Sequence, residues 1–171
     1  MITAADSHRS LLEDILAAFT ANEGVIKLTG PAGSGKSAMC GALFQALRAQ
    51  GTEVVYFLAP PQSVEALQNG IVEQLQLDAT RNFTRTLTHY LRSRAAPYRH
   101  LVLIVDDAHG MDEPTLMAVR MLCNIQSHDH GLVRVVLSGS PALDALLCLP
   151  VYRSLAQRIG QSFVLAPPPL S

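Results

Sequence analysis

The chain has 171 residues, of which 49% are hydrophobic and 16% are charged, and 13 Lys and Arg stand against 14 Asp and Glu. This length suits one domain that buries its core without disulfide or metal crosslinks. The formal net charge of −1 argues against a wholly electrostatic binder of nucleic acid. Three cysteines lie far apart in the sequence, which predicts buried thiols in a reducing compartment. No apolar run approaches the ~20 residues of a bilayer span and no signal-peptide pattern opens the chain, so we expect a cytoplasmic protein.

Apolar residues follow alternating strand and helix patterns along the chain. Strands are expected at residues 25–29, 53–58, 101–105, 132–137 and 162–165. Helices are expected at residues 7–19, 38–50, 63–75, 83–97, 112–125, 141–147 and 152–159, with Ser7, Ser63 and Asp112 as N-caps. This alternation predicts an α/β fold with a doubly wound, mostly parallel sheet. We expect one domain over residues 1–166 and a proline-rich tail over residues 167–171.

A glycine-rich segment joins the first expected strand to the second expected helix. It reads Gly-Pro-Ala-Gly-Ser-Gly-Lys-Ser and matches the phosphate-binding pattern G-x-x-x-x-G-K-[ST] in the strand-to-helix context that the pattern requires. Its glycines let backbone N–H groups converge on phosphate oxygens, while Lys36 suits the β- and γ-phosphates and the Ser37 hydroxyl suits Mg²⁺. The residues expected to hold the nucleotide are Gly30, Pro31, Ala32, Gly33, Ser34, Gly35, Lys36, Ser37 and Ala38.

Two adjacent carboxylates follow the wholly apolar run at residues 101–105. Asp106, the first polar residue after this strand, is expected to hold Mg²⁺, and Asp107 is expected to act as general base toward an attacking water. His109 could orient that base or sense the γ-phosphate, or it could be an ordinary turn histidine. The pairing with the phosphate loop favours function for the two aspartates because the two motifs complete one reaction site.

Three segments, at residues 30–37, 105–109 and 137–143, occur in the order seen in AAA+ ATPases. Over residues 8–165 the chain most resembles the ExeA/GspA-type secretion ATPases and the related TniB-type transposition ATPases. The resemblance implies a P-loop NTPase fold with a five-stranded parallel sheet flanked by helices. It also implies ATP and Mg²⁺ as ligands, ATP-driven assembly, and nucleotide bound at the interfaces of a homo-oligomer.

The resemblance assigns roles to two further residues. Ser140 falls at the position of the polar sensor of the γ-phosphate, with Ser138 as second choice, although Ser140 could instead cap the helix that starts at Pro141. Arg158 falls at the position of the arginine finger, which enters a neighbouring subunit's site, although it could also be a solvated or ion-paired arginine.

The chain departs from the family pattern in two places. The family usually has Glu where this chain has Asp107, which is one methylene shorter. Because a base misplaced by about 1 Å can lower a rate about 100-fold, we expect slow hydrolysis. The chain also ends at Ser171 without the small helical lid that normally follows, which predicts an AAA+ core subdomain.

An arginine-rich stretch lies within residues 81–99, which contain no Asp or Glu. Its members are Arg81, Arg85, Arg92, Arg94 and Arg99. The stretch could dock DNA, an anionic lipid or an acidic partner. A solvated helix face, with some arginines closing interfaces, is the favoured interpretation. The stretch lacks the pattern of interleaved aromatic residues that is typical of binders of single strands.

Three functions remain open on the sequence alone. The leading hypothesis is a Mg-ATP-binding and ATP-hydrolysing module that drives or regulates assembly of an envelope secretion or pilus apparatus, with a protein partner there. This module would lie at the inner face of the membrane if it is part of a longer protein. The second is a DNA-associated helper of transposition or replication that uses Arg81, Arg85 and Arg92. The third is an ATP-responsive scaffold that does not hydrolyse ATP.

Overall fold

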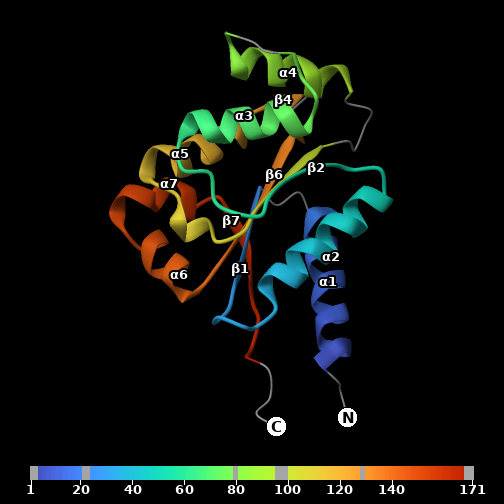
Figure 1. Ribbon diagram of the computed structural model, residues 1–171, viewed down its shortest axis with the longest axis vertical. Coiled ribbons are helices and arrows are strands. Elements are labelled where there is room, and N and C mark those ends of the chain that lie inside the picture. Colours follow the sequence, from blue (N-terminus) through green and yellow to red (C-terminus); the bar gives the residue numbers. More distant parts are fainter. Residues whose placement is uncertain (1–3, 21–23, 79–80, 95–99, 128–129, 168–171) are drawn as a thin grey trace.

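Five parallel strands form the central sheet, in the order β2-β3-β6-β1-β7 (Figure 1). The computed structural model describes residues 4–20, 24–78, 81–94, 100–127 and 130–167. The strands are β1 (Val25–Thr29), β2 (Glu53–Phe57), β3 (Leu101–Val105), β6 (Val133–Gly139) and β7 (Ile159–Val164). The helices are α1 (Ala4–Thr20), α2 (Lys36–Ala49), α3 (Val64–Gln74), α4 (Phe83–Ser93), α5 (Glu113–Leu122), α6 (Pro141–Leu147) and α7 (Arg153–Ala156). The doubly wound, five-stranded parallel sheet expected from the sequence is therefore confirmed.

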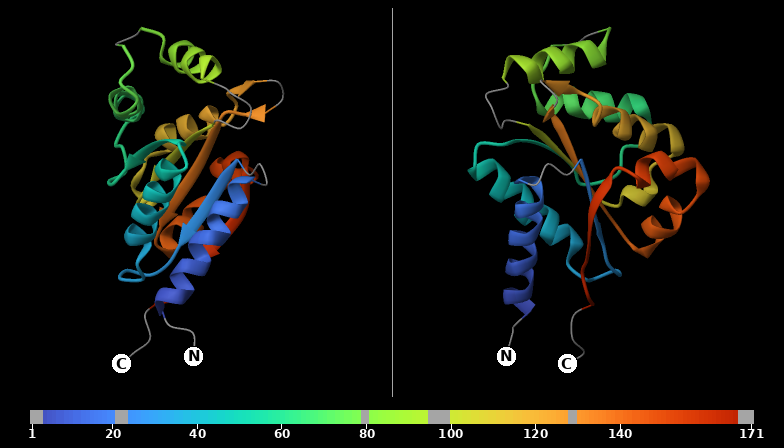
Figure 2. Two further views of the ribbon diagram at one scale, coloured as in Figure 1. Left: turned by 90° about the vertical axis from the view of Figure 1, so that its right-hand side faces the viewer. Right: turned by 180° about the vertical axis from the view of Figure 1, so that it is seen from behind.

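Helices cover both faces of the sheet, and each face has its own apolar core. In Figure 1, α1 and α2 lie to the right of the sheet, while α5, α6 and α7 lie to its left, and Figure 2 gives the side and rear views. The interior strand β3 contributes to both cores, since Leu101 and Leu103 pack on one side and Val102 and Ile104 on the other. Burial on both faces explains why this strand is an unbroken apolar run.

The carboxyl ends of the strands meet at one edge of the sheet, where backbone hydrogen bonds continue past the strands. The Gly30 N–H donates to the Gly139 carbonyl (3.2 Å), and the Asp106 N–H donates to the Phe57 carbonyl (3.0 Å). The chain leaves β1 through α2 on one face and leaves β6 through α6 and α7 on the other. Such a switch point opens a crevice at the carboxyl edge, which is where open α/β sheets bind ligands.

Two of the three predicted N-caps are confirmed. The Ser63 Oγ accepts from the Ala66 N–H (3.0 Å) and an Asp112 carboxylate oxygen accepts from the Thr115 N–H (2.9 Å). The prediction for Ser7 was wrong, because α1 begins at Ala4 and Ser7 lies inside the helix.

Several expected boundaries were also wrong. The helix expected at residues 152–159 is the short α7, which follows the 3-10 turn η2 (Pro150–Tyr152) and already ends at Ala156. Strand β7 begins at Ile159 and not at residue 162. Helix α5 ends at Leu122 and is followed by a two-stranded hairpin, β4 (Gln126–Ser127) and β5 (His130–Gly131), that the sequence did not predict. Helix α4 ends at Ser93 with Arg94 as its C-cap. Residues 95–97 of its expected range and residues 168–171 of the expected tail lie outside the described residues. The domain boundary at residue 166 stays a prediction.

None of the helices described here is long and apolar enough to cross a membrane.

Candidate nucleotide-binding site

The loop between β1 and α2 adopts a backbone that its glycines make possible. Gly33 and Gly35 have φ angles of 76° and 92°, which L side chains rarely adopt. At Gly30 the constraint is steric instead: there is no room for a side chain, because a Cβ there would lie 2.7 Å from the carbonyl oxygen of Leu165. Helix α2 starts at Lys36 with no side chain capping it. Its first N–H groups are therefore available to an anion at the helix N-terminus.

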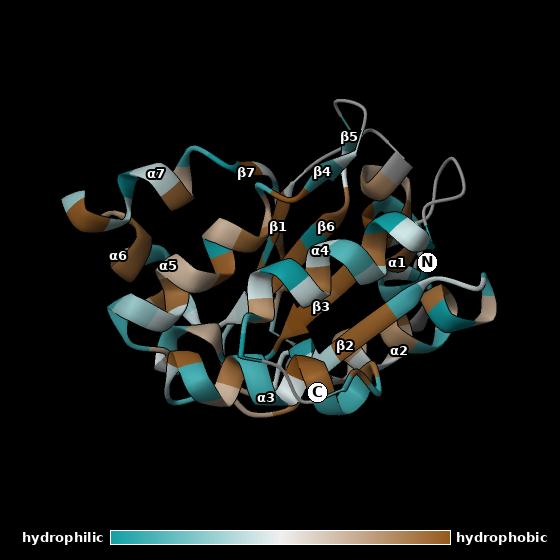
Figure 3. Cartoon of the chain, turned by 90° about the horizontal axis from the view of Figure 1, so that it is seen from above, coloured by the Kyte–Doolittle hydropathy of each residue, from teal (hydrophilic) through white to brown (hydrophobic). Residues whose placement is uncertain are grey.

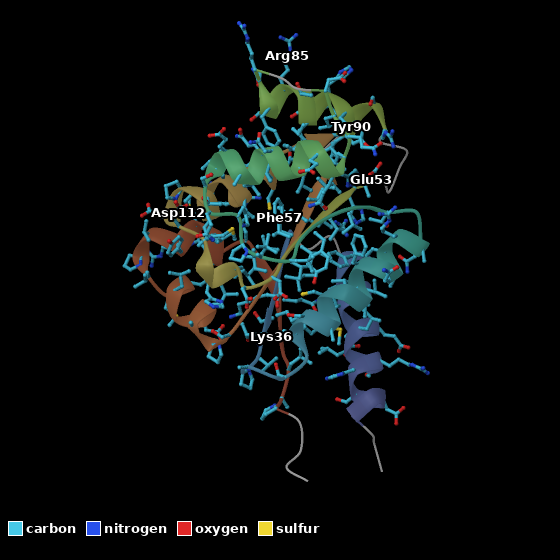
Figure 4. All side chains as sticks on the ribbon, viewed as in Figure 1. Lys36, Glu53, Phe57, Arg85, Tyr90 and Asp112 are labelled. Atoms are coloured by element: carbon cyan, nitrogen blue, oxygen red, sulfur yellow. The ribbon has the colours of Figure 1, made fainter. Side chains whose placement is uncertain are left out.

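Lys36 places a positive charge in this loop. Its side chain is buried, with 9% exposure, and its Nζ donates to the Pro31 carbonyl (2.9 Å). No carboxylate in the described part of the chain forms an ion pair with it. A buried ammonium group without a counter-charge favours an anionic ligand such as a phosphate. In Figure 4 Lys36 lies near the lower end of the sheet, where the loop joins α2.

Ser37 and Asp106 meet although they are 69 residues apart. The Ser37 Oγ donates to Asp106 Oδ2 (2.5 Å), and the other oxygen of Asp106 accepts from the Asp107 N–H (2.9 Å). Asp106 is 3% exposed, so its carboxylate is fixed in place. A hydroxyl and a carboxylate are ligands that suit Mg²⁺. The described residues contain no group of three His, Cys, Asp or Glu that could bind a metal by themselves.

Asp107 lies directly after Asp106 in a different environment. It is exposed and has a left-handed backbone (φ 51°, ψ 42°) that opens a 3-10 turn, η1 (Ala108–Gly110). The exposed carboxylate is accessible to water at the carboxyl edge of the sheet. His109 turns away from solvent in the same turn, and its Nδ1 is buried without a hydrogen-bond partner, 2.9 Å from the position that a Cβ on Gly139 would take. The missing side chain of Gly139 therefore makes room for the imidazole against the end of β6.

A cavity of about 570 Å³ adjoins the phosphate loop. Helix α1, the loop and the segment after β7 line it, with His8, Leu11, Gly35 and Leu165 among the lining residues. The Cε1 atom of His8 lies 3.2 Å from the position of a Cβ on Gly35, so the imidazole packs against the loop itself. The residue patterns did not predict this contribution of α1, although the family resemblance extended to residue 8.

Comparisons with known proteins identify the family of the chain. The model of the AAA domain family matches residues 6–147. The chain belongs to the AAA domain family. It is also 34% identical over 150 residues to the general secretion pathway protein A of Aeromonas hydrophila, a match that covers 84% of this chain and 27% of that protein.

Two solved structures share the fold at low sequence identity. The ORC2 protein of Aeropyrum pernix matches with a TM-score of 0.64 and 17% identity over 94% of this chain and 46% of that one. Cdc6p from Pyrobaculum aerophilum matches with a TM-score of 0.69 and 18% identity over 92% of this chain and 45% of that one. This AAA domain thus spans about a quarter of its secretion relative and under half of these two structures.

The two serines near the end of β6 differ in their surroundings in this AAA domain. Ser140 caps α6, since its Oγ accepts from the Ala142 N–H (3.2 Å). The cap expected as an alternative is therefore present, and a sensor role for Ser140 stays a prediction. Ser138 is fully buried, and its hydroxyl lies beside the Cys40 thiol. Burial raises the pKa of the nearby Cys40 thiol to about 12.

Arg158 lies away from the site of its own chain. It directly precedes β7, donates to Asn124 Oδ1 (2.5 Å), and has its carbonyl oxygen near Gly24, at the amino end of β1. The phosphate loop follows the opposite end of β1, about 16 Å farther along at ~3.3 Å per residue. Arg158 could therefore serve a nucleotide site only on a second copy of the chain.

The arginine-rich stretch is likewise remote from the phosphate loop. Arg92 donates twice to the Gln126 carbonyl (3.1 and 3.0 Å), and Arg94 pairs with Glu53 (2.8 Å). Arg81 and Arg85 are exposed, and Arg99 lies outside the described residues. The favoured interpretation, a solvated helix face with some arginines closing interfaces, fits these contacts of Arg92 and Arg94.

Proposed function

We propose that this AAA domain binds Mg-ATP at residues 30–37 and hydrolyses it. The observation that carries the proposal is the hydrogen bond between Ser37 and Asp106 beside the buried ammonium group of Lys36. On binding, Lys36 would exchange its contact with the Pro31 carbonyl for β- and γ-phosphate oxygens. Ser37 and Asp106 would hold the Mg²⁺, which neutralises charge on the phosphates.

Asp107 is the residue we propose as general base. Its exposed carboxylate would accept a proton from a water molecule as the water oxygen attacks the γ-phosphorus and ADP leaves. The left-handed backbone at Asp107 (φ 51°) sets the direction from which the side chain reaches that water. Aspartate reaches about one methylene less far than glutamate, so we expect slow turnover.

The cavity beside His8 is where we propose that the adenosine part of ATP binds. Its volume of about 570 Å³ falls within the range of small-molecule pockets, and it opens directly onto the phosphate loop. The imidazole of His8, held against Gly35, offers a flat surface for a base to stack on.

The proposed biological role follows the relative's name. A protein of a general secretion pathway that is 34% identical supports a role in assembling an envelope secretion apparatus, with a protein partner at the inner face of the membrane. We also propose a nucleotide-dependent homo-oligomer, because Arg158 lies at the end of the domain opposite its own phosphate loop.

Replacing the proposed base tests hydrolysis separately from binding. Asp107→Asn is expected to bind Mg-ATP as the wild type does while turnover falls by about 100-fold or more, because a general base contributes at least that factor. Phosphate release and nucleotide affinity measured on the same samples check this. Asp78→Asn, at another exposed aspartate, is the control. Wild-type turnover in Asp107→Asn would remove the assignment, and a wild type that binds ATP without turnover would favour the scaffold hypothesis.

A further inference from the structure

Helix α4 buries one face and leaves the other to solvent. Leu87 and Leu91 are buried in the core on the side of the sheet that also holds α3 and α5. The opposite face carries Arg85, His89 and Arg92, at helical positions i, i+4 and i+7. Figure 3, which looks onto this end of the molecule, shows α4 in front with mostly hydrophilic residues.

This exposed face is positively charged and has no acidic residue of its own. The described residues from 81 to 94 contain no Asp or Glu, and no ion pair in the described part of the chain engages Arg85. In Figure 4 Arg85 points outward, away from the body of the molecule. A shallow depression of about 490 Å³ lies along it. Its lining consists only of polar residues, namely Arg85, Thr88, His89, Arg92 and Ser93.

We propose that this α4 basic face, which comprises Arg85, His89 and Arg92, binds the phosphate backbone of duplex DNA. Arg92 also donates to the Gln126 carbonyl, a neutral acceptor that leaves its positive charge uncompensated. Arg85 and Arg92 are seven residues apart, which is about 10.5 Å along a helix at ~1.5 Å per residue. A DNA strand carries one phosphate per ~3.4 Å of axis, so about three phosphates lie opposite this span. Arginines and hydroxyl groups such as that of Thr88 are the side chains that contact phosphates and position a protein on DNA.

The same face is poorly suited to a membrane or to single-stranded nucleic acid. A helix that lies on a bilayer inserts its apolar face, but Leu87 and Leu91 are already buried in the core. Proteins that bind single strands stack bases on exposed aromatic rings. Helix α4 carries two aromatic rings, Phe83 and Tyr90, and both pack against the core. Tyr90 is also covered by Arg94 at 4.7 Å and donates its hydroxyl to Glu53 (2.8 Å). Of these three ligands, the α4 basic face therefore suits the backbone of a duplex best, in a contact that reads no sequence.

The α4 basic face and the phosphate loop lie at opposite ends of the molecule. Figure 4 shows Arg85 at the top and Lys36 near the lower end of the sheet. Both sites can therefore be occupied at once, and a substitution at Arg85 leaves the nucleotide site unchanged. For this reason, DNA binding and ATP hydrolysis can be tested separately, and the failure of one proposal can be told from the failure of the other.

Fluorescence anisotropy of a labelled duplex, measured with the full chain across a salt series, tests the proposal. With about three phosphates neutralised, the slope of log K against log salt is expected near −2.7, so affinity falls about 40-fold between about 50 and about 200 mM salt. Arg85→Ala is expected to reduce the slope by about 1. Arg85→Glu is expected to weaken binding by about tenfold or more at low salt. Circular dichroism and ATP affinity of these variants are expected to match the wild type.

Arg48→Glu is the matched control, since it makes the same change in net charge at an exposed residue on α2. It is expected to retain DNA binding. Three results would each overturn the proposal: no binding at low salt, equal weakening by Arg48→Glu and Arg85→Glu, or tighter binding of polyglutamate than of DNA. The last result would assign the face to an acidic protein partner instead.

Discussion

At the scale of single residues, two neighbouring aspartates have different chemistry because they differ in burial. Asp106 is 3% exposed and bonded to Ser37 and to the backbone of Asp107, while the Asp107 side chain is exposed. Aspartate and asparagine tolerate the left-handed backbone found at Asp107 better than most residues do. Asp107→Asn therefore removes the carboxylate without straining the turn, which makes it a clean test of the base.

The cysteines offer a second test at this scale. Burial raises the pKa of the Cys40 thiol to about 12 and that of Cys123 to about 11, whereas Cys148 is exposed. A raised pKa keeps the thiol protonated and unreactive as the pH rises through about 8.5, where a free cysteine ionises. A thiol reagent near pH 8 is thus expected to modify one cysteine in the folded protein and all three in denaturant.

The control for this assay is Cys148→Ser, which is expected to leave no reactive thiol in the folded state. Rapid modification of two or three cysteines without denaturant would show that the two cores are more open than the structure indicates.

At the scale of elements, Ser140 is the single residue between the end of β6 and the start of α6. Its hydroxyl accepts from the Ala142 N–H, and Pro141 follows at the first helical position. Ser140→Ala is expected to lower the free energy of unfolding by about 1 kcal/mol through loss of the cap, while Ser140→Asn, an equally good cap, retains it. Urea denaturation measures both variants. Equal stability of wild type and Ser140→Ala would contradict the cap, and loss of turnover in both variants at unchanged stability would favour the sensor role.

The elements that the sequence predicted well are those whose environment is uniform along their length. Strand β3 is buried on both faces, so its five apolar residues have sharp bounds in the sequence. Strand β7 is an edge strand in which half-buried and exposed residues alternate, and Gly160 and Gln161 concealed its first half. The β4–β5 hairpin has two residues in each strand, too few for any periodic pattern.

The site was predictable as far as local motifs extend. The glycines of the phosphate loop allow its backbone conformation, so the sequence pattern at residues 30–37 was enough to predict the shape of the loop. The contact of Ser37 with Asp106 depends on the order of the strands, since β6 lies between β1 and β3. Likewise, the burial of His109 against Gly139 depends on which strand lies beside η1. No spacing in the sequence carries that information.

At the scale of the whole molecule, the carboxyl and amino ends of the parallel strands carry different candidate functional residues. The phosphate loop, Asp106 and Asp107 lie at the carboxyl edge, while Arg158 lies at the amino edge beside Asn124. If a second copy supplies the arginine, Arg158→Ala is expected to assemble with ATP as the wild type does, while turnover falls by about 1000-fold. Size-exclusion chromatography and phosphate release with and without ATP check this. Arg153→Ala, at a nearby arginine, is the control. If Arg158→Ala keeps its turnover as this control does, Arg158 has only a structural role through its hydrogen bond with Asn124.

The central claim is that residues 30–37 hold Mg-ATP, and calorimetric titration of the full chain with ATP tests it most directly. The wild type is expected to bind ATP in the presence of Mg²⁺ and more weakly when the metal is chelated, because Ser37 and Asp106 act through the ion. Lys36→Ala is expected to abolish binding, and Arg48→Ala is expected to retain it. Unchanged ATP affinity in Lys36→Ala would contradict the account.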